Sequence, residues 1–264
     1  LGADSITDFL CLSFSSTDYV GHQYGPNAIE TEDTYIRLDR DMADLLTFLD
    51  NRIGKGKYLV YLTADHACME NPKHMMDHKI HAGFVSSAGI EDSLRSLLTR
   101  TYGHPEYIRC FINDQVYLHE DKILADKNDI CAIEATIARY AKDHIQGVYL
   151  GLTSCDLETE SYDDMIRQRI QNGHFHGRSG NVWLVYAPGW TERLYGGDGT
   201  QGTTHGSPYA YDAHVPLYWF GWNIPAGSST DLVNITDIAP TLSFLLNITL
   251  PNGCTGNKID ALVK

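Results

Sequence analysis

Apolar residues in the first quarter of the chain form two short runs separated by a longer periodic stretch. Phe9–Phe14 and Tyr58–Leu62 are almost continuously apolar, as expected of strands that are buried on both faces. From Tyr35 to Ile53 the apolar side chains recur three and four positions apart, which predicts an amphipathic helix. Strand, helix and strand in this order predict a βαβ unit, in which the two strands are parallel.

The pattern changes between residues 71 and 176, where short strand-like and helix-like segments alternate. This segment predicts two helices, a hairpin and a further strand: residues 92–100 and 129–144, Tyr107–Ile112 with Val116–Leu118 turning on Asn113-Asp114, and residues 148–152. Residues 181–186 and 216–220 then read as strands that rejoin the main sheet, and residues 235–247 as a closing helix. We therefore predict an α/β fold with a mostly parallel sheet flanked by helices, formed by residues 1–70 and 177–264, and an inserted α+β cap subdomain at residues 71–176.

Composition narrows the classes of partner. The formal net charge is −14, with 43% hydrophobic and 20% charged residues, as in ordinary globular proteins. No basic run could follow a nucleic-acid backbone, so nucleic acid is not an expected partner. No apolar run reaches the roughly 20 residues needed to span a bilayer. Three of the six cysteines, Cys110, Cys131 and Cys155, fall within or near the predicted cap, where either a disulfide or separate thiols are compatible with the spacing.

Two short motifs place polar side chains where the two buried runs end. Asp18 and His22 follow the first run, and Asp65-His66 follow the second. Because ligands of parallel α/β sheets bind at the carboxyl ends of the strands, both motifs are expected at one edge. A spacing of four residues would put Asp18 and His22 on one face of a helical turn.

A third candidate, His205, lies in the glycine-rich segment 202–208. Two carboxylates and three imidazoles can hold a pair of divalent metals, and this ligand set suits Zn²⁺, with Mn²⁺ or Fe²⁺ as alternatives. Such a pair is typical of hydrolysis at phosphorus. The alternative of another class is a metal-free binding module whose polar side chains are only hydrogen-bonded to one another.

Two other groups of histidines carry weaker signals. His74, His78 and His81 have helical spacing and could form an accessory metal site, although a solvated helix face is the usual role of such residues. His174 and His176 are expected to face solvent.

The same motifs resemble those of the alkaline phosphatase superfamily, and within it bacterial alkaline phosphatases of the PafA type. The resemblance rests on segments 13–26, 62–66, 202–217, 237–242 and 251–254, and so extends over nearly the whole chain. It implies that Asp18, His22 and His205 bind one zinc ion and that Asp65 and His66 bind the other. Ala67-Cys68 departs from the pattern, because a glycine usually follows the Asp-His pair.

What the resemblance implies for function is hydrolysis of small phosphate monoesters in the periplasm or outside the cell, with a threonine as nucleophile. That threonine, a further aspartate ligand and the phosphate-contacting residues have no counterpart motif in these 264 residues. We therefore expect the chain to be the carboxy-terminal half of a longer enzyme and to be inactive alone. Phosphodiesterases and nucleotide pyrophosphatases share the same ligands and form the nearest alternative. The oligomeric state is not predicted.

Overall fold

The computed structural model describes residues 3–193 and 199–263, which belong to two compact units. The larger unit contains Phe9–Asp41 and Ala64–Val215, and the smaller contains Leu1–Asp8, Met42–Thr63 and Pro216–Lys264. Helices and sheets occur in both, so the predicted α/β class is confirmed. These boundaries do not coincide with those of the expected core and cap, and the assignment of residues 71–176 as a cap stays a prediction.

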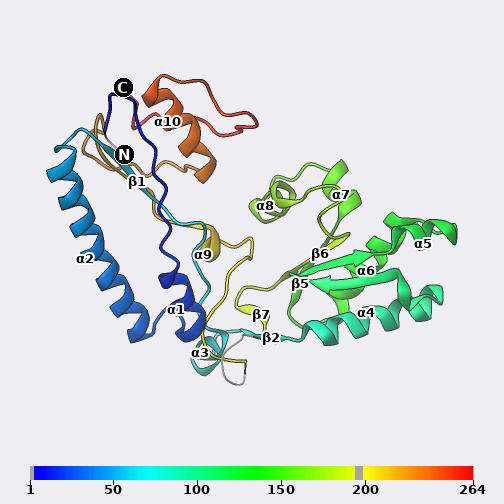
Figure 1. Ribbon diagram of the computed structural model, residues 1–264. Coiled ribbons are helices and arrows are strands. Elements are labelled where there is room, and N and C mark those ends of the chain that lie inside the picture. The colour runs from blue at the N-terminus through cyan, green and yellow to red at the C-terminus, as the bar shows by residue number, and fades with distance from the viewer. Residues whose placement is uncertain (1–2, 194–198, 264) are drawn as a thin grey trace. The chain divides into compact units, whose positions relative to one another are not determined.

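Among the described residues, the largest sheet is a four-stranded antiparallel one in the larger unit (Figure 1). Its strands follow the order β3-β4-β6-β5, with bounds Ile108–Ile112 for β3, Gln115–Leu118 for β4, Val182–Tyr186 for β6 and Val148–Thr153 for β5. The predicted hairpin between β3 and β4 is confirmed. Asn113 and Asp114 have φ angles of 49° and 61°, the positive values that a tight two-residue hairpin turn requires.

Helices cover both faces of this sheet because side chains along a strand alternate between the faces. On one face Leu184 packs into a core with α4 (Ser87–Tyr102) and α6 (Ile130–His144). On the other face Val185 packs with residues of α7 (Ser154–Thr159) and α8 (Met165–Gly173). The predicted helices 92–100 and 129–144 are therefore confirmed, and both contribute to a fully buried core.

The prediction that the strand at residues 181–186 rejoins a mostly parallel main sheet is wrong. This strand, β6, pairs with β4 and β5 instead of rejoining a main parallel sheet. An apolar run indicates that both faces of a strand are covered, but it carries no information on which strand lies beside it. The long-range pairing could not be predicted from the run alone.

The expected βαβ unit is also absent from the described residues. The helix is present as α2 (Ile29–Arg52), and the second strand as β1 (Leu59–Leu62), which pairs antiparallel with β8 (Tyr218–Gly221). Phe9–Phe14, however, adopts no strand. A strand requires a hydrogen-bonding neighbour, and the described residues place none beside this run.

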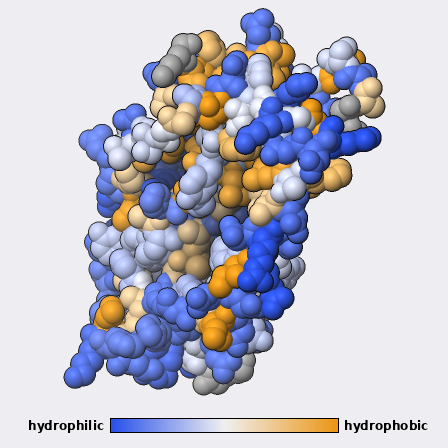
Figure 2. Space-filling view, turned by 90° about the vertical axis from the view of Figure 1, so that its left-hand side faces the viewer, coloured by the Kyte–Doolittle hydropathy of each residue, from blue (hydrophilic) through white to orange (hydrophobic). Residues whose placement is uncertain are grey.

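The Phe9–Phe14 run is instead part of an exposed apolar surface. Phe9 is 64% exposed and Leu10 58%. Figure 2 shows apolar residues at the surface, in orange, among the polar ones. Scattered apolar side chains are normal on a protein surface, but a continuous run of this kind has the composition of a buried strand.

Short elements complete the two units. The larger contains α1 (Ser16–Tyr24), α3 (Pro72–Asp77), η1 (Pro105–Tyr107), α5 (Glu120–Ala125), α9 (Ala210–Ala213) and the parallel pair β2 (Gly83–Val85) and β7 (Trp190–Glu192). In the smaller unit, a capping box between Asn234 and Asp237 starts η2 (Ile235–Asp237) and then α10 (Ile238–Leu246), which confirms the predicted closing helix.

Among the described residues, no helix is both long and apolar enough to cross a membrane.

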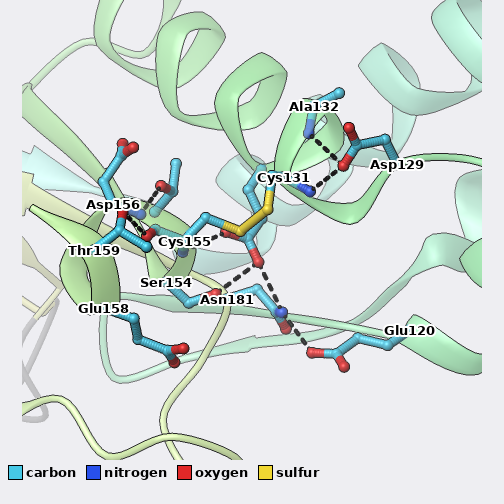
Figure 3. The surroundings of a disulfide bond; sticks show 12 residues. Glu120, Asp129, Cys131, Ala132, Ser154, Cys155, Asp156, Glu158, Thr159 and Asn181 are labelled. Atoms are coloured by element: carbon cyan, nitrogen blue, oxygen red, sulfur yellow. Dashed lines mark hydrogen bonds between the residues drawn. A yellow bond between two sulfur atoms is a disulfide. The ribbon is translucent and has the colours of Figure 1, made fainter.

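A disulfide between Cys131 and Cys155 joins α6 to α7 (Figure 3). Cys110 is a free thiol, so only two of the three cysteines of this region are bridged. Beneath the bridge, the fully buried Glu134 carboxylate accepts hydrogen bonds from Ser154 Oγ (2.7 Å), Asn181 Nδ2 (3.0 Å) and Cys155 N (3.2 Å). Burial raises the pKa of Glu134, and these three donors oppose that rise.

Replacement of both bridged cysteines by alanine should destabilise the larger unit. The bridge closes a loop with a sequence separation of 24 residues, for which the loss of chain entropy in the unfolded state corresponds to about 3 kcal/mol. Urea unfolding of Cys131→Ala/Cys155→Ala against the parent measures the difference. Cys110→Ala, which removes a free thiol from β3, is the control. A double-variant loss no greater than that of the control would contradict a stabilising role for the bridge.

Candidate metal centre

Helix α1 brings the first pair of predicted ligands together. Asp18 and His22 lie one helical turn apart, and His22 Nε2 is 3.5 Å from Asp18 Oδ1. Asp18 is in the first turn, where the positive end of the helix dipole favours a carboxylate. The spacing of four residues predicted that the two side chains share one face of a helical turn, and α1 brings them together in this way.

The second predicted pair follows β1. His66 Nε2 lies 3.8 Å from Asp18 Oδ1 and 3.8 Å from Asp65 Oδ2. The two partners differ in environment, because the Asp65 side chain is 91% exposed while that of Asp18 is 41% exposed. Asp65 therefore belongs to the outer edge of the cluster.

His205 joins the cluster from a separate loop. Its Nε2 is 3.8 Å from Asp18 Oδ1, and its ring stacks on that of His66 with 3.3 Å between the ring centroids. Burial, followed by the nearby His66 ring, lowers the pKa of His205. A neutral imidazole at neutral pH is the protonation state that a metal ligand needs.

Main-chain oxygens orient two of the three imidazoles. His22 Nδ1 lies 2.9 Å from the Thr203 carbonyl oxygen, and His66 Nδ1 lies 2.9 Å from the Ala67 carbonyl oxygen. A carbonyl oxygen only accepts, so each Nδ1 carries the hydrogen and the lone pair of the neutral ring is on Nε2. In both residues Nε2 is the atom that faces Asp18.

These residues fit a divalent metal. One ligand atom each from Asp18, His66 and His205 lies within 4.8 Å of the others. Two ligands of a tetrahedral zinc site, at bonds of about 2.0–2.1 Å, are roughly 3.3 Å apart, only slightly closer than the 3.5–3.8 Å between Asp18 and the imidazoles. This geometry groups His66 with Asp18 and His205, whereas the resemblance assigns His66 to the other metal. The division of ligands between two metals stays a prediction.

The loop that carries His205 is fixed against α1 by contacts that the sequence reading missed. Thr203 N donates to Gly21 O (3.1 Å) within α1. Gly202 has a φ of 77°, and a Cβ added there would lie 1.9 Å from His22 O. Asn71, the N-cap of α3, donates from Nδ2 to Gly202 O (2.6 Å). The glycine-rich composition of this segment indicated a close approach to another part of the chain. It did not indicate that this part would be α1.

Of the two histidines that were expected to face solvent, His174 and His176, only one does so. His174 is wrongly predicted to face solvent: its side chain is 6% exposed, and it contacts Glu158 through Nε2 (3.1 Å) and Trp183 through Nδ1 (3.4 Å). His176 is 85% exposed, as predicted. Burial raises the pKa of the Cys68 thiol, as do the charges of Asp212, Glu70 and Asp18, so the thiol beside the cluster is a poor nucleophile.

The profile of one protein family, described as type I phosphodiesterase / nucleotide pyrophosphatase, matches residues 2–208. The chain belongs to this family. It is 39% identical to a protein from Myroides odoratus named "Calcium-transporting ATPase", over 98% of this chain and 46% of that protein. It is 38% identical to alkaline phosphatase PafA of Elizabethkingia meningoseptica, over 100% of this chain and 47% of PafA.

The fold comparison agrees with this family membership. A crystal structure of wild-type PafA superposes with a TM-score of 0.91 at 36% sequence identity, and the match covers all of this chain and 49% of that one. These relatives place the family within the alkaline phosphatase superfamily, as the resemblance implied. The chain spans about half the length of the curated relatives it matches.

A Gly202→Ala substitution should separate the His205 loop from α1. The alanine would have to adopt a positive φ, at about 1–3 kcal/mol, and its Cβ would collide with His22 O as well. Gly177→Ala is the matched control, because Gly177 has a φ of 73° and no atom within 4 Å of an added Cβ. Urea unfolding should show a loss about 2 kcal/mol greater for Gly202→Ala than for Gly177→Ala. Equal losses would mean that the close contact with α1 does not matter.

Proposed function

We propose that the protein hydrolyses phosphate monoesters at a two-zinc centre to which this chain contributes Asp18, His22, Asp65, His66 and His205. The observation that carries the proposal is the convergence of imidazole Nε2 atoms on Asp18 Oδ1, at 3.5–3.8 Å, from three separate segments of the larger unit. The alkaline phosphatase named among the relatives supports the reaction class.

Each side chain has a defined part in this proposal. The Nε2 lone pairs of His22 and His66 would be ligands, since their Nδ1 hydrogens are bonded to carbonyl oxygens. The Asp18 carboxylate lies between the imidazoles and would neutralise part of the cationic charge. When bound, a metal pair activates the nucleophile and stabilises the departing oxygen of the ester. It also supplies the local positive charge that attracts phosphate to a protein whose net charge is −14.

We further propose that the 264-residue chain has little turnover by itself. Asp65 and His66 are only two side chains for a second metal, and Asp65 is almost fully exposed. The resemblance assigns the remaining carboxylate ligand and the threonine nucleophile to a part of the relatives that this chain does not match. Catalysis would then need residues beyond these 264.

A second candidate function is hydrolysis of phosphodiesters or nucleotide pyrophosphates. The description of the family favours it, because the profile that matches residues 2–208 is that of phosphodiesterases and nucleotide pyrophosphatases. Both reactions use in-line displacement at phosphorus, so the ligands described above serve either. Groups that contact the second ester oxygen decide between them.

For the location of the protein we propose the periplasm or the outside of the cell. The Cys131–Cys155 disulfide supports an oxidising compartment, since such bridges are rare in the cytosol of mesophiles.

His205→Ala should weaken zinc binding to the chain by at least about 100-fold, or about 2.7 kcal/mol, because it removes one of the three converging ligand atoms. Isothermal titration with Zn²⁺ measures the affinity. His176→Ala is the control, since this exposed imidazole lies outside the cluster and its loss should leave the affinity unchanged. If the parent chain binds no zinc, manganese or iron, the metal-free binding module becomes the better account.

Substrate preference should be tested on the full-length protein, with 4-nitrophenyl phosphate and bis(4-nitrophenyl) phosphate compared at equal concentration. We expect faster release of nitrophenol from the monoester. Faster release from the diester would favour the second candidate function. The 264-residue chain, measured in parallel, should release little from either, and a rate comparable with that of the full-length protein would disprove its dependence on residues elsewhere.

A further inference from the structure

Beside the candidate metal centre lies a buried carboxylate to which the proposed function gives no role. Asp212, in α9, is 3% exposed. Its Oδ2 accepts hydrogen bonds from Ser207 N (2.9 Å) and Ser207 Oγ (2.6 Å), while its Oδ1 is buried and has no hydrogen-bond partner among the described residues. An unpaired carboxylate oxygen in the interior is costly, so its retention calls for a compensating positive charge.

The contacts of Asp212 connect two of the segments that carry predicted ligands. Ser207 is two residues after His205, so the side chain of Asp212 fixes the loop directly after that imidazole. The main-chain oxygen of Asp212 accepts from Ala67 N (2.8 Å), one residue after His66. One residue therefore holds both segments by separate groups.

The side chain of Asp212 also lies close to the His205 imidazole. Asp212 and His205 line one cavity of about 70 Å³, large enough for a water molecule. Burial raises the pKa of Asp212, whereas the Ser207 hydrogen bonds and the His205 and His66 rings lower it. Groups that hold the ligands of a metal in place affect its affinity, and their loss typically weakens binding 10- to 100-fold.

We propose that Asp212 is a positioning residue of the metal centre. Its carboxylate fixes the His205 loop through Ser207 and places a negative charge beside the imidazoles, while its main-chain oxygen holds the segment of Asp65 and His66 through Ala67. Main-chain carbonyls contact the rings of His22 and His66, whereas Asp212 supports His205 through the loop, by its hydrogen bonds to Ser207. This inference rests on the proposed function, because it requires that the imidazoles bind a metal.

Asp212→Asn tests the charge with little change of size, since an asparagine oxygen can still accept from Ser207. We expect the affinity of the chain for Zn²⁺, measured by titration, to fall 10- to 100-fold. The visible absorption spectrum of the Co²⁺-loaded chain should change as well, because it reports the geometry of the ligands. A merely structural role would lower thermal stability without changing either measurement in the variant that remains folded.

Asp237→Asn is the matched control. Asp237 is also a buried aspartate (8% exposed), whose oxygens accept from Asn234 N and Asn257 N at 2.8 Å each, but it lies in the smaller unit. This variant should lose stability yet keep the parent's zinc affinity and cobalt spectrum. If Asp212→Asn does not fold, Ser207→Ala replaces it: loss of the hydroxyl bond to Oδ2 should weaken zinc binding about threefold to tenfold.

The outcomes separate the two proposals. Parent-like zinc affinity and cobalt spectrum in folded Asp212→Asn, or parent-like affinity in Ser207→Ala if that variant has to be used, would overturn the role of Asp212 and leave the metal centre standing. A parent chain that binds neither Zn²⁺ nor Co²⁺ would overturn the metal centre itself and, with it, the positioning role.

Discussion

The arrangement of the site depends on one carboxylate oxygen that three imidazoles share. Asp18 Oδ1 lies 3.5 Å from His22 Nε2 and 3.8 Å from the Nε2 atoms of His66 and His205. One protonated imidazole could satisfy this oxygen, but three imidazolium groups at such distances would repel one another strongly. A divalent cation removes that conflict, because it accepts all the lone pairs at once. The geometry therefore agrees with the metal coordination that we propose.

That convergence is maintained by the main chain more than by side-chain pairing. Carbonyl oxygens of Thr203 and Ala67 fix the rings of His22 and His66. The close approach of Gly202 to α1 leaves no space for a side chain, so the loop and the helix meet backbone to backbone. Such contacts tolerate little movement, so the proposed ligands would be held in place before a metal binds.

Short sequence patterns predicted turns and helical spacing correctly, but they did not predict which strands pair across long distances in the sequence. The Asn113-Asp114 turn was readable because two residues with positive φ suffice to define it. The spacing of Asp18 and His22 was readable because one helical turn defines it. Phe9–Phe14 misled because an apolar run predicts burial whatever surrounds it, and here the run is exposed. Asp212 lies within segment 202–217, which carries the resemblance, but its contacts with Ser207 and Ala67 arise only in the folded chain and could not be predicted.

The candidate centre is also tied to the hydrophobic core of the larger unit. Tyr209 packs against the cluster of Val185 and Ile170, and its hydroxyl donates to the Tyr186 carbonyl oxygen of β6 (2.7 Å). Arg169 of α8 donates to Pro208 O (2.6 Å), three residues after His205. Strand β6 of the sheet and helix α8, which packs on one face of that sheet, thus support the loop that presents the imidazole. Because close-packed interiors transmit small displacements, a cavity made beneath Tyr209 would move His205 without changing any proposed ligand. The pairing of β6, which the sequence did not predict, therefore matters to the candidate site as well as to the fold.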